Sequence, residues 1–134
     1  MAESNALLAQ ALREQHSRLR PVLYAAQAAA RRSLVSGYGA GALQLAVLDL
    51  RRELTLHLDH EDARLIPALR GLDQWGPARS ELLAAEHTHQ RAALSALGEP
   101  IPGGSVLGWR VLTLCDEILE DMEFEERELL PPLG

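Results

Sequence analysis

Apolar residues recur every three or four positions in four long stretches of the chain, which is the spacing of one face of an α-helix. These stretches cover residues 5–35, 42–69, 78–97 and 105–130. Segments rich in glycine and proline separate them. Pro21 lies inside the first stretch, where its ring removes one backbone hydrogen bond and can kink the helix. The pattern predicts four amphipathic helices joined by short loops.

The second half of the chain repeats the pattern of the first half. Residues 54–69 match residues 118–133, and part of the first helix matches part of the third. The matched pairs between those two helices are Leu12 with Leu83, His16 with His87, Arg20 with Arg91, and Leu23 with Leu94. Four helices with short loops form an up-down-up-down bundle. We therefore expect an all-α, antiparallel four-helix bundle with a pseudo-twofold internal repeat, forming one domain over residues 1–134.

Imidazole and carboxylate side chains interrupt the apolar stripe of each predicted helix. His57 and Glu61 stand four residues apart on the second helix and therefore share a face, and Asp121 and Glu125 occupy the matching places on the fourth. With one histidine on each remaining helix, the candidate ligands are His16, His57, Glu61, His87, Asp121 and Glu125. A lone histidine on such a face is usually an ordinary core or surface residue. Six such groups in repeated register predict a metal site instead, because burying them without cations costs several kcal/mol or more.

The ligand types restrict which metal such a site would hold. Imidazole with carboxylate suits iron, manganese or zinc, whereas an all-oxygen site would suit magnesium or calcium. Carboxylates can also bridge two ions, so a pair of divalent metals would balance the buried charge. A helix that carries both groups four residues apart can hold one ion terminally and bridge it to the next.

This pattern resembles the HHE cation-binding motif of the hemerythrin-like family, which reads H…HxxxE…H…HxxxE on a four-helix bundle. His16 falls on the first histidine, His57 and Glu61 fall on the first HxxxE, and His87 falls on the histidine of the third helix. The Leu-Ile-Pro and Leu-Leu-Pro segments that follow the two ligand pairs also resemble the family. The resemblance covers nearly the whole chain.

The resemblance implies a centre with two non-haem iron ions, for which manganese or zinc is the alternative. Glu61 and Glu125 would bridge the ions. One ion would be held by His16 and His57, and the other by His87 and Asp121. Water or small anions would complete each coordination shell.

The chain departs from the family on the fourth helix, where Asp121 stands in place of the motif histidine. Aspartate can bind iron, so the site either survives in a more carboxylate-rich form or loses one metal position. The oxygen carriers of the family have a second histidine at the position of Arg91. An HxxxxD register on the last helix would select Glu126 as the bridge, whereas the internal repeat selects Glu125.

Four further polar residues lie near the candidate site along the sequence. His60 is one turn from His57 on a neighbouring face, and either is solvated or supports a ligand. His89 is an alternative to His87 as the ligand on the third helix. Arg20 and Arg91 each follow a histidine by four residues, and are either solvated charges or partners of a carboxylate at the metal site.

The resemblance implies a protein that binds or reacts with dioxygen, peroxide or nitric oxide, in sensing, storage or detoxification. It favours a metal and small-ligand binding protein over a dedicated enzyme. Asp121 motivates two alternatives. One is a carboxylate-rich diiron or dimanganese enzyme acting as a peroxidase or ferroxidase, and the other is an interaction bundle that has lost its metal.

Composition narrows the possible partners and the compartment. The net charge is −6 and no run of basic residues is longer than two, which argues against nucleic acid and acidic membrane surfaces as partners. The single cysteine, Cys115, excludes an internal disulfide and fits a reducing compartment. No signal peptide or membrane span is evident, so a cytoplasmic location is expected. Apolar residues outside the stripes, such as Leu45, leave room for a homodimer or a protein partner.

Overall fold

The computed structural model describes residues 4–99 and 104–134, and the ordered elements within these ranges are all helical. In chain order the elements are α1 (Asn5–Ser36), α2 (Ala40–His60), η1 (Glu61–Leu65), α3 (Ile66–Arg70), α4 (Gly76–Leu97), α5 (Gly104–Phe124), η2 (Glu125–Leu129) and η3 (Pro131–Leu133). Consecutive elements α2, η1 and α3 form one continuous rod, as do α5 and η2. The described residues thus contain the four helical rods that the sequence predicts, and α1 continues past Pro21.

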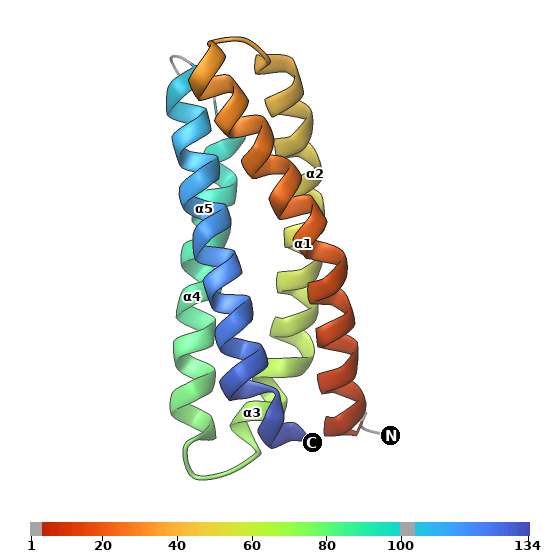
Figure 1. Cartoon of the computed structure of the whole chain (residues 1–134). Helices are drawn as coiled ribbons and strands as arrows, with labels where there is room; N and C mark the ends of the chain where they lie inside the picture. The colour runs from red at the N-terminus through yellow and green to blue at the C-terminus, as the bar shows by residue number, and fades with distance from the viewer. Residues whose placement is uncertain (1–3, 100–103) are drawn as a thin grey trace.

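The four rods run antiparallel to their neighbours in the sequence, so that both chain ends lie at the same end of the bundle (Figure 1). The turn between the first two rods uses Gly37, whose φ of 71° closes α1 in the left-handed conformation that glycine adopts without strain. Where the second rod meets the third, Gly76 leaves no space for a side chain, since a Cβ there would lie 1.9 Å from the carbonyl oxygen of Leu69. The up-down-up-down bundle predicted from the sequence is therefore confirmed.

Two separate apolar clusters fill the bundle. The upper cluster comprises Leu19, Leu23, Ala26, Ala29, Ala30, Leu43, Val47, Leu50, Leu54, Leu58, Leu94, Leu97, Val111, Leu114, Cys115, Ile118 and Met122. The lower cluster comprises Leu8, Ala9, Leu12, Leu65, Ile66, Leu69, Leu83, Leu129, Leu130 and Leu133. On every rod the candidate histidines and glutamates fall in the sequence between members of the two clusters, so they form a polar layer between two dry ones.

Each of the two candidate glutamates begins a π-helical turn. The carbonyl oxygen of Glu61 accepts a hydrogen bond from the backbone N–H of Ile66, and that of Glu125 accepts one from Leu130 at 2.8 Å. A proline follows each donor, at Pro67 and Pro131, and proline has no N–H to continue an α-helical ladder and clashes with the carbonyl four residues earlier. Widening the turn relieves this clash, and such turns often occur at functional sites.

Cys115 lies inside the upper cluster and is fully buried. Burial, with a smaller contribution from the charge of Asp116, raises the pKa of the Cys115 thiol to about 12. The group is therefore a neutral packing element at physiological pH. Among the described residues, no helix combines the length and apolar character that crossing a membrane requires.

Candidate metal centre

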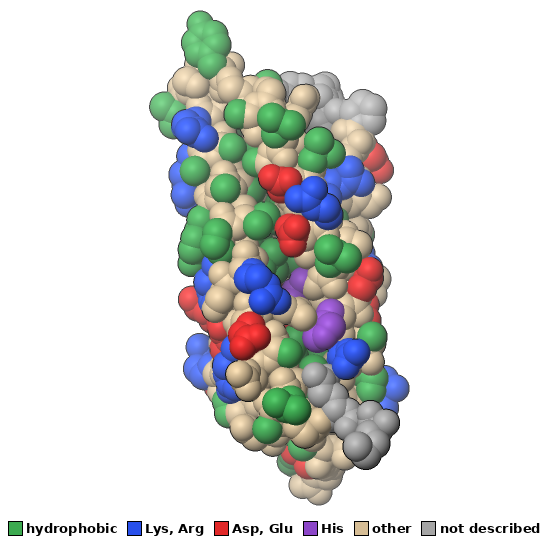
Figure 2. All heavy atoms as spheres, turned by 90° about the vertical axis from the view of Figure 1, so that its right-hand side faces the viewer, with side chains coloured by type: hydrophobic (Ala, Val, Ile, Leu, Met, Phe, Trp, Pro, Cys, Tyr) green, Lys and Arg blue, Asp and Glu red, His purple; other side chains and the backbone are tan. Residues whose placement is uncertain are grey.

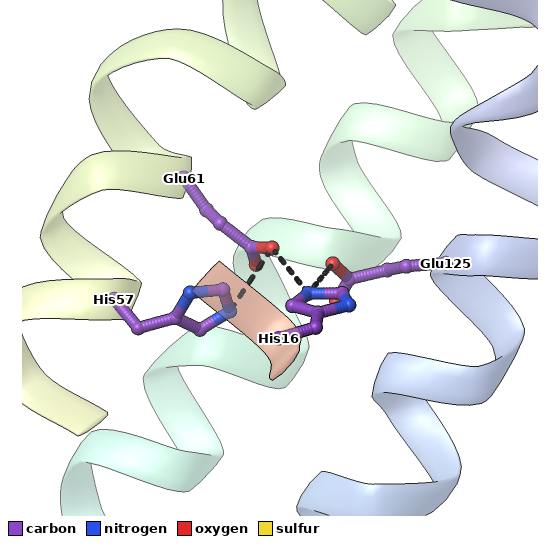
Figure 3. Close-up of side chains that lie close together, drawn as sticks. All are labelled: His16, His57, Glu61 and Glu125. Atoms are coloured by element: carbon purple, nitrogen blue, oxygen red, sulfur yellow. Dashed lines mark ion pairs between the residues drawn. The ribbon is translucent and has the colours of Figure 1, made fainter. Parts of the chain in front are cut away.

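Four side chains from three rods meet in the polar layer between the apolar clusters. His16 comes from α1, His57 from the last turn of α2, and Glu61 and Glu125 from the starts of η1 and η2. One ligand-type atom of each lies within 4.8 Å of those of the other three, and all four residues are buried. Figure 3 shows the two imidazoles and the two carboxylates pointing toward one another.

The spacing of these atoms is that of ligands around one cation. The Glu61 Oε2 atom lies 3.1 Å from His57 Nε2 and 3.6 Å from His16 Nε2. Glu125 Oε1 lies 3.4 Å from His16 Nε2. With metal–ligand bonds of about 2.0–2.2 Å, two donors on one ion stand about 3 Å apart at a right angle and about 4.2 Å apart when opposite. The four residues therefore fit a divalent cation.

Hydrogen bonding within the protein leaves part of this cluster unsatisfied. Among the described residues, both ring nitrogens of His16, Oε2 of Glu61 and Oε1 of Glu125 are buried without a hydrogen-bond partner. A buried polar atom without a partner costs about 1–3 kcal/mol, so native proteins rarely leave several together. A cation among these atoms would satisfy them, and this is the strongest structural evidence that the cluster is a metal site.

The two carboxyl groups of the cluster differ in their affinity for a proton. Burial alone would raise the pKa of Glu61, but its contacts with Glu125 and with His16, His57 and His87 outweigh burial and hold that pKa well below its usual value. Burial, followed by the negative charge of Glu61, raises the pKa of Glu125 well above its usual value. The pair therefore carries one negative charge and one proton, and a divalent cation would replace that proton.

His87 approaches the cluster from α4 and contacts the other oxygen of Glu61. Its Nε2 atom lies 3.0 Å from Glu61 Oε1, and its Nδ1 atom lies 2.6 Å from Asp62 Oδ1. Asp62 in turn pairs with Arg91 at 2.5 Å. Burial lowers the pKa of His87, but the bonds to Glu61 and Asp62 raise it further, so the net pKa lies above its usual value. His87 thus belongs to the same polar layer, with both ring nitrogens engaged.

Every histidine of the layer turns Nε2 inward and Nδ1 toward a polar group outside the cluster. Nδ1 of His57 lies 3.2 Å from Gln15 Oε1, and Nδ1 of His16 lies 3.7 Å from Glu126 Oε1. Glu126 is itself bound by Arg20. An outer acceptor of this kind fixes the ring orientation and tautomer of a metal-binding histidine.

The outer contacts of His16 and His87 follow the internal repeat. On each side, an arginine four residues after the histidine binds the acidic residue that directly follows the motif glutamate: Arg20 with Glu126, and Arg91 with Asp62. Both arginines therefore pair with carboxylates beside the centre, and Glu126 lies in the outer ring while Glu125 lies in the cluster.

Asp121 lies apart from the four clustered residues. Its carboxylate accepts a hydrogen bond from the side-chain amide of the buried Gln90, and the aspartate itself is half-buried. Burial and the nearby charges of Glu86, Glu117 and Glu120 raise the pKa of Asp121 to about 6. The same acidic residues line a surface groove of about 450 Å³ between α4 and α5.

His60 and His89 lie outside the four-residue cluster. The half-buried His60 contacts Gln15 through Nδ1 at 3.1 Å, so Gln15 links it to His57. A cavity of about 300 Å³ between α1 and α2 is lined by these three residues, and histidine side chains are visible on that face of the molecule in Figure 2. His89 is 69% exposed and pairs with Glu117 on the opposite side of the bundle.

Three residues with direct contacts to the polar layer escape the sequence analysis as candidates: Gln15, Asp62 and Gln90. A signal for Asp62 exists in the repeat, because both motif glutamates are followed by a second acidic residue. Glutamine carries no such signal, since its amide can serve a ligand or face solvent equally well.

Residues 7–133 match the family model of the hemerythrin HHE cation binding domain. No curated protein and no solved structure matched the chain. The family match spans nearly the whole chain, and the helical bundle and the buried histidine–glutamate cluster agree with it. The chain therefore belongs to the hemerythrin HHE cation-binding domain family.

Proposed function

We propose that this protein holds two non-haem iron ions in its polar layer and uses them to bind or react with dioxygen, peroxide or nitric oxide. Manganese or zinc would suit the same ligands. In this proposal His16 and His57 hold one ion, and His87 and Asp121 hold the other. Glu61 and Glu125 bridge the two. The observation that carries the proposal is the group of buried donor atoms without hydrogen-bond partners in the cluster.

The protein's own residues would prepare the centre in three ways. The imidazoles present Nε2 to the ion because Gln15, Asp62 and Glu126 occupy the side of Nδ1. The two glutamates supply negative charge that offsets that of the cations. The upper and lower clusters keep the layer dry from both ends, which strengthens the electrostatic attraction between ligands and ions.

When bound, ferrous iron supplies an open coordination position and an electron for small diatomic ligands or peroxide. A small ligand can approach from the α1–α2 side, where the cavity of about 300 Å³ reaches His57. This opening suits a small molecule better than a large organic substrate. We therefore favour sensing, storage or detoxification of a small ligand over catalysis on a metabolite.

The test is elemental analysis and an optical spectrum of the full chain purified from iron-supplied cells. We expect iron bound to the chain, and near-ultraviolet charge-transfer bands that change on adding dioxygen, peroxide or nitric oxide to the reduced protein. Protein that contains no metal and gains none from ferrous ion would overturn the proposal. That result would instead support a metal-free interaction bundle.

Replacing Asp62 with Asn is expected to weaken binding of the ion held by His87 about 10- to 100-fold, as for other outer partners of metal-binding histidines. The Asn oxygen can still accept from Nδ1, but the negative charge that Arg91 holds beside the ring is lost. A calorimetric titration with ferrous ion under argon would measure the change. Asp59→Asn is the control, because Asp59 also pairs with Arg91 at 3.0 Å but is 61% exposed. Equal affinities in the two variants would remove Asp62 from the site.

A carboxylate-rich peroxidase or ferroxidase is the second candidate. The acidic groove formed by Glu86, Glu117, Glu120 and Asp121 favours it, because such a groove can collect ferrous ions next to the centre. Repeated oxidation of added ferrous ion, or repeated turnover of hydrogen peroxide, would identify the enzyme. A single stoichiometric reaction would identify the binding protein.

A further inference from the structure

The two halves of the polar layer are unequal, although the sequence repeat makes them look alike. On the side of His16, three inward-facing atoms have no hydrogen-bond partner among the described residues: His16 Nε2, Glu61 Oε2 and Glu125 Oε1. They lie 3.4 and 3.6 Å apart across the cluster, at the spacing of donors around one ion. A cation entering here displaces no hydrogen bond between those atoms.

On the side of His87, the ligand-type groups already have partners within the protein. His87 contacts Glu61 through Nε2 at 3.0 Å and Asp62 through Nδ1 at 2.6 Å. Asp121 accepts a hydrogen bond from Gln90, whose side chain is 4% exposed. A cation bound between His87 and Asp121 would have to replace the bond to Glu61 and compete with the amide of Gln90.

From this asymmetry we infer that the two metal positions are not equivalent. The first cation enters among His16, His57, Glu61 and Glu125 and binds tightly. The second position, between His87 and Asp121, binds at least about tenfold more weakly, because Gln90 holds Asp121 away from it. Gln90 is thus a positioning residue that sets how many ions the protein carries. The inference rests on the proposed function, since it concerns the same centre.

The bundle offers a matched control for Gln90. Gln27 is also a buried glutamine, 6% exposed, and its Nε2 atom donates to Asp116 Oδ1 at 2.8 Å. That bond links α1 to α5 beside the upper cluster, away from the polar layer. Replacing either glutamine with leucine removes one glutamine–aspartate hydrogen bond of the same kind, but only Gln90→Leu frees a carboxylate next to the centre.

The experiment is an anaerobic calorimetric titration of the metal-stripped full chain with ferrous ion. Ions per chain are counted by mass spectrometry after gel filtration. For the wild type we expect one retained ion and a second binding step at least about tenfold weaker. In Gln90→Leu the second step should tighten at least about tenfold while the first is unchanged, and Gln27→Leu should match the wild type. Gln90→Ala serves as a second variant if Gln90→Leu does not fold.

Two outcomes would overturn this inference while leaving the proposed metal site in place. One is a wild type that binds two ions with equal affinity. The other is a second binding step that neither Gln90 variant changes. A wild type that binds no ion overturns the proposed function, and the inference fails with it. The number of binding steps in the wild type therefore separates the two failures.

Discussion

Replacing Glu61 with Gln is expected to weaken metal binding by at least about 100-fold while the bundle stays folded. Glu61 is 1% exposed and contacts the three imidazoles of the layer. Its two oxygens face different histidines, with His57 beside Oε2 and His87 beside Oε1. Glutamine keeps the shape of the side chain but loses its charge and presents an amide nitrogen that does not bind metals. Both proposed metal positions therefore lose a ligand with one substitution.

Calorimetric titration with ferrous ion would measure the loss, and circular dichroism would show that the helices remain. Glu53→Gln is the matched control, since Glu53 is on the same rod but is 42% exposed and pairs with Arg52. We expect Glu53→Gln to bind metal like the wild type. If Glu61→Gln did so too, the cluster could not be the metal centre.

Ferrous ion is expected to raise the thermal midpoint of the wild type by about 10 °C and that of His57→Leu by almost nothing. A ligand at about 100 times its Kd stabilises a protein by about 2.7 kcal/mol, and a domain of this size gains roughly 3–6 °C for each kcal/mol. His57 lies next to Leu58 and one turn after Leu54, both fully buried. In the absence of metal, leucine at position 57 removes a buried polar ring, so this variant should then be at least as stable as the wild type.

The substitution therefore changes sign with the metal: it is neutral or stabilising without iron and destabilising with it. Scanning calorimetry of both proteins, each with and without ferrous ion, measures the four midpoints. His89→Leu is the control, because His89 is 69% exposed and should leave the metal-induced shift intact. An equal shift in the wild type and in His57→Leu would exclude His57 as a ligand.

The bundle could be predicted because its helices follow one simple rule. Leucine and alanine recur at helical spacing, and the repeat of residues 54–69 at 118–133 shows that two hairpins pack in the same way. The same spacing places His16, His57, Glu61 and Glu125 at one level, since each is preceded and followed by core residues on its own rod. Their convergence follows from the helical period and the antiparallel packing alone.

The fate of Asp121 could not be predicted in this way. Spacing places it on the stripe that carries Glu125, but whether it faces the centre or a neighbour depends on the rotation of α4 against α5. In the structure that rotation buries Gln90 beside Asp121 and leaves Arg91 half-exposed and paired with Asp62. The sequence leaves the inward residue open between Gln90 and Arg91, because both can lie near the edge of the same helical face.

The outer acidic residues escape prediction for a different reason. In a regular α-helix, the residue after Glu61 points about 100° away from it. That places Asp62 away from the stripe, where a sequence pattern reads it as solvated. Its contact with His87 crosses from one rod to another, and so depends on helix packing rather than on spacing along a single chain segment.

The two π turns make the number of residues between the cores part of the design of the protein. A π turn holds one more residue than the α-helical turn it replaces, so removing one residue from 62–65 would restore a regular helix and rotate all that follows by about 100°. Leu69 would then turn away from the lower cluster, although Glu61 itself would be untouched. The same holds for residues 126–129 and Leu133. A one-residue deletion here would therefore act on the far end of the bundle, whereas one of the same size between residues 71 and 75 would fall in a loop.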